Sequence, residues 1–297
     1  MSTGWGDYGL TRGVPSSKSL PQLCYDNPIH GPEPLMKKYL TLFRVNWQKS
    51  LQYRFSVVIY ILGYSMYISV LLYLWTAIYQ DGGKIGNYEL PELLTYYLLQ
   101  LAVNTVIFSY VSWEIIDHIK DGLFSNFLTK PIHPFRYWLT VDLSGKILEI
   151  LFITLAIGLM ALVVAKHFFF PPHLIDWLHF FIACFLAIIL AFELDFCIGM
   201  IAFWLIQVKV FKYMLQTVIF FFAGALLPID IFPETLHRIA EALPFQYLVF
   251  FPVSIYLGKV ADPWPSFLGM IGWIVVLYIL AHVLLSRGIK RYVAVGG

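Results

Sequence analysis

The sequence predicts an all-α integral membrane protein, and its composition and its long apolar windows are the two observations that predict it. Of the 297 residues, 59% are hydrophobic and only 13% are charged. Soluble domains carry roughly twice this share of charged residues. A helix that crosses a hydrocarbon core of ~30 Å needs ~20 apolar residues. Windows of about this length or more occur at 55–78, 91–113, 146–165, 177–206, 212–228 and 266–285.

Each of the six windows is predicted to be a transmembrane helix. A backbone in lipid must satisfy its own hydrogen bonds, and the windows lack the alternating pattern of a barrel strand. The distribution of Lys and Arg indicates the orientation, because the side predicted to be extracytoplasmic holds only Lys84, Lys166, Arg238 and Lys259. The positive-inside rule then places both termini in the cytoplasm, in a multi-pass protein of the cell membrane.

Two segments precede the first window. Residues 1–35 are rich in Gly, Pro and Ser and contain no apolar core of a signal peptide, so they are predicted to be a disordered extension. Within 37–54, Leu40, Phe43 and Trp47 recur at helical spacing beside basic residues. This pattern favours an amphipathic helix in the inner membrane interface. The alternative is a basic flank that only sets the topology.

The loop between the second and third windows, "EIIDHIKDGLFSNFLTKPIHPF", is a polar segment between apolar ones. A short helix near 115–129 would place Ile116, Ile119, Leu123 and Phe127 on one side, which could dock into a cleft of another protein. We expect Phe124 or Phe127 to anchor that contact, because an exposed ring needs a partner surface. The alternative is an ordinary solvated loop.

Two carboxylates, Glu193 and Asp195, lie inside the fourth window. An unpaired carboxylate in lipid costs several kcal/mol, about 2.5–3.5 for Asp on insertion scales, so each needs a partner, water or a proton. Their side chains are ~200° apart around a helix and cannot share one face. One interpretation is that one of them lines a hydrated path or gate. The other is an ion pair with Lys146, Lys209 or Lys212 that stabilises the bundle.

The segment after the fifth window, "GALLPIDIFPETLHRIAEALPFQYLVFFP", predicts a short amphipathic helix. Leu236, Ile239, Ala240 and Leu243 form an apolar stripe, and Pro244 ends the helix. The apolar residues that follow are too few to cross the membrane. We therefore expect a re-entrant segment in the outer leaflet, with an interfacial loop as the alternative.

Motifs for soluble chemistry are mostly absent. The sequence has no G-x-x-x-x-G-K-[ST], G-x-S-x-G or H-E-x-x-H, so it is not expected to hydrolyse ATP or to be an enzyme of those classes. His173, Asp176 and His179 have a spacing that could bind a metal, but interfacial histidines are the ordinary explanation, and we predict no metal site. Cys184 and Cys197 would lie ~20 Å apart on one helix, too far for a disulfide.

Over residues 36–291 the chain resembles the permease subunits of type-2 ABC exporters. These have a basic amphipathic helix, six spans, a cytoplasmic coupling helix between the second and third spans, and a re-entrant pair before the sixth. The stretch "KDGLFSNFLTKPIHPF" resembles the coupling-helix pattern at Gly122, Leu128, Pro131 and Pro134. The outer segment resembles the motif before the last span at Pro228, Phe232, Pro233 and Pro244.

The resemblance implies that residues 36–297 form the transmembrane domain of an ATP-driven exporter. It implies a dimer with a second copy and two separate ATPase subunits that bind ATP and Mg, while this chain binds no cofactor and no nucleic acid. The alternatives are a membrane scaffold or sensor partnered with an ATPase, or an intramembrane enzyme that uses Glu193 and Asp195. The residues implied in ATPase coupling are Asp117, Lys120, Asp121, Gly122, Phe124, Phe127, Pro131 and Pro134.

Overall fold

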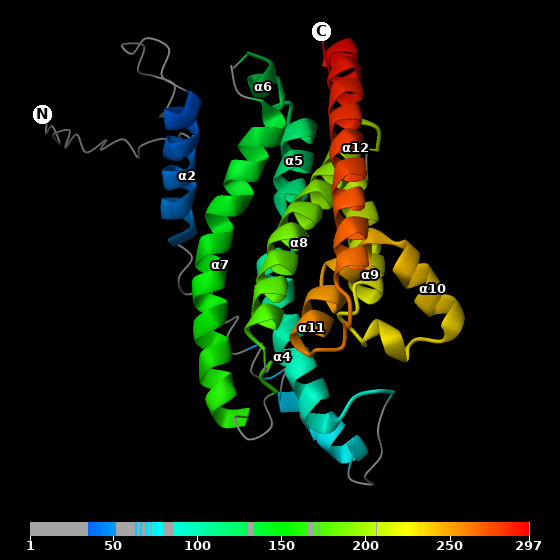
Figure 1. Ribbon diagram of the computed structural model, residues 1–297. Coiled ribbons are helices and arrows are strands. Elements are labelled where there is room, and N and C mark those ends of the chain that lie inside the picture. Colours follow the sequence, from blue (N-terminus) through cyan, green and yellow to red (C-terminus); the bar gives the residue numbers. More distant parts are fainter. Residues whose placement is uncertain are drawn as a thin grey trace, which may run out of the picture. The chain divides into compact units, whose positions relative to one another are not determined.

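We describe a computed structural model of the chain, in which residues 35–51, 63, 66, 69–71, 73–79, 86–129, 133–164, 169–171, 173–205 and 207–296 are described. The chain divides into two units, Met1–Leu40 and Thr41–Gly297, and all packing reported below lies within the second. In the described residues every regular element is helical (Figure 1). The all-α prediction is confirmed. The extension up to residue 34, most of the first window, Lys84 and Pro131 lie outside the described residues.

The first described helix, α2 (Leu35–Leu51), covers most of the segment predicted to be amphipathic. Its Phe43 and Trp47 rings stack with centroids 6.5 Å apart, as expected of residues four positions apart on one helix face. Leu40 on the same helix is exposed. The helix prediction is therefore confirmed, whereas its place at a membrane interface remains a prediction.

The window 91–113 was expected to form one helix, and that expectation is wrong. The chain forms α4 (Leu90–Ile107) and α5 (Val111–Lys120), separated by three residues that are not helical. Phe108 has an extended backbone conformation with ψ of 135°. The break consists of Phe108, Ser109 and Tyr110 and contains no Gly or Pro, so no helix-breaking residue signals it.

The single helix expected near 115–129 is also wrong, because a turn divides it. α5 ends at Lys120, and a short α6 (Ser125–Thr129) follows. Gly122 in this turn has a φ of 75°, a conformation that only glycine adopts without strain. The turn and α6 reverse the chain, and α7 (Pro134–Val164) then begins at Pro134.

The fourth and fifth windows form α8 (Leu174–Met200), which continues into η3 (Ile201–Phe203), and α9 (Val208–Phe222). α9 begins before and ends earlier than the predicted 212–228. The chain leaves the helix at Gly224, whose φ is 78°. α9 has 15 residues and rises roughly 22 Å, which is less than a full bilayer core.

The outer segment forms η4 (Ile229–Ile231), α10 (Glu234–Ala242), η5 (Pro244–Tyr247) and α11 (Phe250–Tyr256), and α12 (Trp264–Gly296) follows. The predicted short helix before Pro244 is confirmed. Its apolar stripe is only partly covered, because Ala240 is buried whereas Ile239 is 44% exposed.

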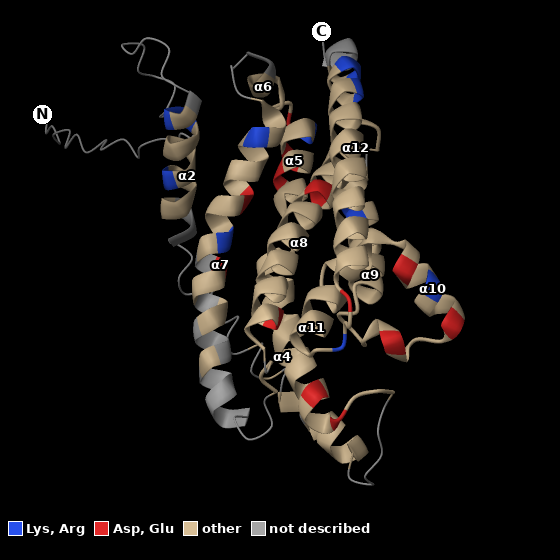
Figure 2. Cartoon of the chain, in the orientation of Figure 1, with Lys and Arg blue, Asp and Glu red and all other residues tan. Residues whose placement is uncertain are grey.

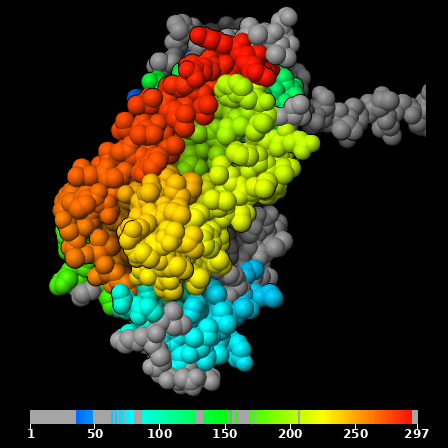
Figure 3. Space-filling view, turned by 90° about the vertical axis from the view of Figure 1, so that its right-hand side faces the viewer, coloured from blue at the N-terminus to red at the C-terminus, as the bar shows by residue number. Residues whose placement is uncertain are grey.

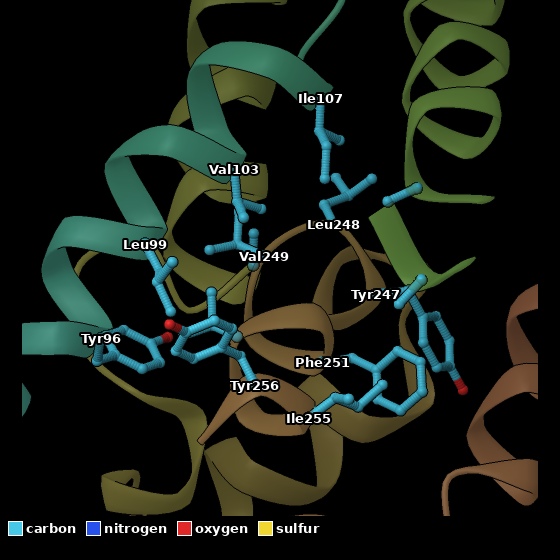
Figure 4. Close-up of a cluster of buried hydrophobic side chains, with 14 of the residues drawn as sticks. Tyr96, Leu99, Val103, Ile107, Tyr247, Leu248, Val249, Phe251, Ile255 and Tyr256 are labelled. Carbon is cyan, nitrogen blue, oxygen red and sulfur yellow. The ribbon is translucent and has the colours of Figure 1, made fainter. Parts of the chain in front are cut away.

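The core consists of two clusters of buried side chains. The larger one joins α4, α8, α11 and α12, and Figure 4 shows Leu99, Val103 and Ile107 of α4 facing Leu248 and Val249. The smaller one joins α5, the start of α7, η3 and the end of α12. α8 packs against α5, α11 and α12 and therefore contributes to both clusters.

Among the described residues, three helical segments are long and apolar enough to cross a membrane: Leu90–Lys120, Leu174–Phe203 and Trp264–Tyr292. The first of these contains the break between α4 and α5. Together with the composition, these segments support a multi-pass membrane protein.

Candidate functional site

The break between α4 and α5 brings polar side chains from several helices into the apolar core. We call this group the polar junction, and it consists of Ser109, Ser112, Asp142, Lys146, Asp195 and Lys212. Lys146 comes from α7, Asp195 from α8 and Lys212 from α9. Both lysines and Asp195 are buried. Charged groups at such depth persist only where other groups compensate them.

Lys146 caps the C-terminal end of α4. Its Nζ donates to the carbonyl oxygens of Val106, Ile107 and Phe108 at 2.8, 3.2 and 2.9 Å. The last carbonyls of a helix have no partner within that helix, and the partial negative charge at this end attracts a cation. The ammonium group therefore replaces the hydrogen bonds that α4 loses where it stops.

Asp195 caps the N-terminal end of α5. Its carboxylate accepts from the backbone N–H of Ser112 at 2.8 Å and from the Ser112 hydroxyl at 2.7 Å. The side chain of the residue at the N-cap position, Tyr110, does not cap the helix. A carboxylate from another helix thus satisfies a free N–H of the first turn, where the partial positive charge of the helix favours an anion.

The four charges of the polar junction form two ion pairs. Asp195 lies 3.1 Å from Lys212, and Asp142 lies 3.7 Å from Lys146. The Ser109 hydroxyl donates to Asp142 at 2.8 Å. Lys212 also contacts the Ser112 hydroxyl. Each buried charge faces an opposite one, so the junction as a whole is neutral.

Lys212 has an aromatic contact as well. Its Nζ lies 4.5 Å from the centroid of the Trp113 ring, within the range of a cation–π interaction. Trp113 follows Ser112 on α5. Lys212 of α9 therefore contacts the first turn of α5 through both the Ser112 hydroxyl and the Trp113 ring. A small recess lined by Ser109, Asp195 and Lys212 opens beside this contact.

Of the two carboxylates singled out in the fourth window, only Asp195 takes part in the polar junction. Its partner Lys212 is one of the three lysines expected from the sequence. Glu193 is 2% exposed, and its Oε2 has no hydrogen-bond partner among the described residues. No role was predicted from the sequence for Ser112 or Asp142. Nothing in the sequence near a serine or an aspartate indicates that its side chain will contact residues of a distant helix.

We expected an exposed aromatic ring in the loop after α5, and for Phe124 this expectation is wrong. Phe124 is 0% exposed, and its ring contacts those of Phe127, Phe203 and Tyr292 at centroid distances of 5.4, 5.1 and 5.9 Å. The Tyr292 hydroxyl donates to the Gly122 carbonyl at 2.7 Å. Phe124 therefore holds the turn onto η3 and α12. Its burial rules it out as an exposed anchor for another protein.

Other side chains of this turn do face outward. Lys120, Asp121 and Gly122 are exposed, and Leu123 is 46% exposed. Phe127 is half-buried under the aromatic contact with Phe124. The exposed surface next to α6 therefore combines a leucine with charged and small polar residues.

Two further coupling candidates hold the chain together. Asp117 of α5 forms an ion pair with Lys209 at the start of α9, at 2.6 Å, and both side chains are about half exposed. Pro134 is buried at the start of α7. Pro131 lies outside the described residues.

Polar contacts attach the outer segment to the start of α4. The Tyr88 hydroxyl donates to Asp230 at 3.2 Å, and Lys259 donates to Glu92 at 2.9 Å while its Nζ lies 4.2 Å from the Tyr88 ring centroid. Burial raises the pKa of both Tyr88 and Asp230 above their ordinary values. Tyr96 of α4 donates to the Gly224 carbonyl at 2.6 Å.

The four residues noted in the outer motif lie at the ends of its short helices. Pro228 and Pro233 precede η4 and α10, and Pro244 begins η5. The Phe232 ring stacks on Phe221 of α9 at 4.9 Å. The prolines thus set the corners of the segment, since a fixed φ suits the start of a helix.

His173 lies at the N-cap position of α8, and Asp176 and His179 lie in its first turns. No cluster of three or more His, Cys, Asp and Glu side chains with suitable geometry occurs in the part of the chain that the structure describes. Cys184 and Cys197 are free thiols, in agreement with their predicted separation.

The family described as ABC-2 family transporter protein matches residues 64–296, which include every element from α4 to α12. A search among curated proteins finds no match.

Proposed function

The chain belongs to the ABC-2 transporter family, and we propose that it is the permease subunit of an ATP-driven exporter that works as a dimer with two separate ATPase subunits. Membership supports a permease role, with ATP hydrolysis in a partner. The dimer of two copies, the outward direction of transport, six spans and cytoplasmic termini belong to the proposal. The positive-inside asymmetry supports this orientation.

The observation that carries the proposal is the way in which the turn between α5 and α6 is fixed to the bundle. Phe124 is buried against η3 and α12, and Tyr292 is hydrogen-bonded to the turn. A displacement of the turn must therefore move α5 and α12 with it, because packed interiors transmit strain. An ATPase that pushes on residues 120–126 would act directly on two helices of the membrane domain.

The surface offered to the ATPase consists of Lys120, Asp121, Leu123 and the start of α6. We propose that Leu123 is the apolar anchor of this contact, since it is the exposed apolar side chain in the turn. The surrounding charges would form the rim. Interface energy is concentrated in a few such side chains, with a milder and salt-sensitive contribution from the rim.

The outer segment is proposed to be re-entrant. α10 and α11 are too short to cross a bilayer, and α11 is buried among α4, α8 and η5. Helices at membrane depth that do not span are tolerated where protein surrounds them. The intramembrane-enzyme alternative finds no support at Glu193 and Asp195, because Asp195 is engaged by Lys212 and Ser112.

Co-purification with the partner ATPase tests the proposal. We expect the permease in detergent to retain an ATPase encoded beside it, and we expect Leu123→Ser to weaken this retention and to uncouple ATP turnover from cargo. Leu226→Ser is the matched control, since Leu226 is 51% exposed on the outer segment. Failure of any ATPase to bind the wild-type chain would overturn the proposal. Equal losses for the two leucine variants would overturn the role of the turn.

Labelling of single cysteines tests the orientation. A cysteine at Lys259 should react with an impermeant reagent added to intact cells, and one at Lys120 should react only after the membrane is opened. Both side chains lie next to helix ends and outside the apolar cores of the helices. Reaction at position 120 in intact cells would contradict cytoplasmic placement of the turn.

A further inference from the structure

The C-terminal half of α12 has a groove along one face. Its apolar part is lined by Tyr278, Ile279 and Val283, and its polar part by His282, Ser286, Arg287 and Lys290. We call this the α12 groove. Its residues recur at intervals of three to four positions, which places them on one face of a helix. The apolar part comes first along the helix, and the cationic part lies nearer its end.

The opposite face of α12 is used for packing. Ala281 and Leu285 are buried in the smaller core cluster, and Tyr292 packs against Phe124 and Phe203. The side chains that line the groove include exposed residues, such as Ile279 and Lys290. Figure 3 shows α12 in orange to red as a continuous ridge of side chains at the surface. The groove is therefore held in place from behind by the core and remains open in front.

Aromatic rings at and just before the start of α7 contact His282, which lies between the apolar and the cationic parts of the groove. The His282 ring lies 5.1 Å from that of Phe135 and 5.8 Å from that of His133. Nδ1 of His282 lies 2.9 Å from the Tyr278 carbonyl oxygen, and the Ser286 hydroxyl donates to the His282 carbonyl at 2.7 Å. These contacts fix the histidine between the apolar and the cationic parts.

The cationic end of the groove has no counter-charge on its own helix. From residue 263 to the C-terminus the sequence contains no Asp or Glu. Arg287 and Lys290 are exposed, and neither they nor Arg291 form an ion pair among the described residues. Figure 2 shows these basic residues grouped near the end of α12. An anion at this point would meet two cations on adjacent turns.

We propose that the α12 groove binds an anionic phospholipid of the cytoplasmic leaflet. Its phosphate lies between Arg287 and Lys290 beside Ser286, and its acyl chains follow Ile279 and Val283. The distance along the helix from Ile279 to Arg287 is roughly 12 Å, so one lipid spans both parts. The order from apolar to cationic matches the order from acyl chain to phosphate. α12 is long and apolar enough to cross the membrane, which places its charged end at headgroup level.

A lipid explains both parts of the groove, whereas a free phosphate would use only the cationic part. The inference is independent of the partner ATPase; it depends on the membrane placement of α12 and, for the choice of leaflet, on the orientation proposed above. A permease that lost its ATPase in the co-purification test could still bind the lipid. The two proposals can therefore fail separately.

Binding of a fluorescent phosphatidylglycerol to the purified full-length chain in mild detergent tests the proposal. We expect unlabelled phosphatidylglycerol to displace the probe, phosphatidylcholine to displace it far less, and inorganic phosphate not to displace it. Equal competition by phosphatidylcholine would show an unspecific apolar surface and overturn the proposal. Displacement by inorganic phosphate at matched concentration would also overturn it in favour of a phosphate site.

Variants locate the site. Arg287→Gln with Lys290→Gln should weaken probe binding about tenfold, because two charge-assisted contacts to the phosphate are lost. Lys37→Gln with Arg44→Gln removes the same charge from exposed positions on α2 and should leave binding unchanged. Ile279→Asn with Val283→Asn should weaken binding of the lipid through the apolar part.

Thermal unfolding of each variant in detergent identifies folded protein, and only folded variants enter the comparison. If the apolar pair proves unfolded, Ile279→Ala with Val283→Ala takes its place. Equal weakening in the control pair would show diffuse charge attraction and overturn the site. If the Arg287 and Lys290 variant loses ATPase retention while it keeps lipid binding, the groove is a protein contact and the proposal is wrong.

Discussion

The two ends of α5 are attached to the rest of the protein by different forces. At the N-terminal end, the polar junction holds it through the Asp195 carboxylate, the Lys212 ammonium and two serine hydroxyls. At the C-terminal end, the turn is held by the buried ring of Phe124 among other aromatic rings. Buried charge contacts are directional and depend on every partner, whereas aromatic packing depends on volume and shape. The difference teaches that the position of the N-terminal end of α5 depends on a few directional contacts, whereas that of the C-terminal end depends on close packing of rings.

The comparison bears on how a push at the turn would travel. In the described part of the chain, no backbone hydrogen bond joins α4 to α5 across the break between these two helices. Lys146 and Asp195 bind the two facing ends separately, and they come from α7 and α8. A push on α5 would therefore act first on α8 and α9, whose Asp195 and Lys212 contact Ser112.

The largest expected effect is the loss of one partner in the polar junction. Asp195→Leu leaves the buried ammonium of Lys212 unpaired and the first turn of α5 uncapped, and it should lower the free energy of unfolding by about 4 kcal/mol. An SDS titration of the purified chain measures this change. Adding Lys212→Met to the same chain removes the orphaned charge and should recover at least half of the loss. No recovery would mean that the ion pair is not what stabilises this end of α5.

A comparable but smaller loss is expected at the other end of α5. Phe124→Ala leaves a cavity between η3 and α12 and should cost about 3 kcal/mol. Leu123→Ala on the same turn is the control and should change stability by less than about 1 kcal/mol, because its side chain is half exposed. The same SDS titration compares them. Similar losses for both would show that the turn is not packed as described.

Glu193 offers a test of a buried carboxylate outside the polar junction. Its Oε2 has no partner among the described residues, so Glu193→Gln removes no described contact and should shift the stability by under about 1 kcal/mol. If Glu193 lines a hydrated path, this variant should keep its stability and lose transport. Unfolding titration and a transport assay on the same preparation separate the two. A large loss of stability would point to an ion pair and reject the path.

The smallest expected effect belongs to the exposed ion pair of Asp117 and Lys209. Lys209→Gln should change the free energy of unfolding by no more than about 0.5 kcal/mol, because solvent screens the pair. High salt should abolish even that difference. A loss of unfolding free energy as large as that of Asp195→Leu would show that the exposed pair stabilises the protein as much as the polar junction does. That result would contradict the expected difference between buried and exposed charges.

Much of the architecture follows from patterns that the sequence alone contains. Its composition and apolar windows predict a helical membrane protein, and the prolines and apolar stripe predict the short helix α10. The cost of a carboxylate in lipid requires a partner for Asp195, and Lys212 is one of the predicted candidates. These features depend on residues that are close in the chain or on the solvent that surrounds it.

Only the tertiary structure decided where α4 stops, where Phe124 lies and which groups cap the helix ends. The caps come from residues 38 to 83 positions away, since Lys146 binds the Phe108 carbonyl and Asp195 accepts from the Ser112 N–H. Phe124 is buried because η3 and the end of α12 fold over it. Helical periodicity records which residues share one face of one helix. It carries no information about which distant side chain will reach a free carbonyl or a free N–H, and that choice is made by packing.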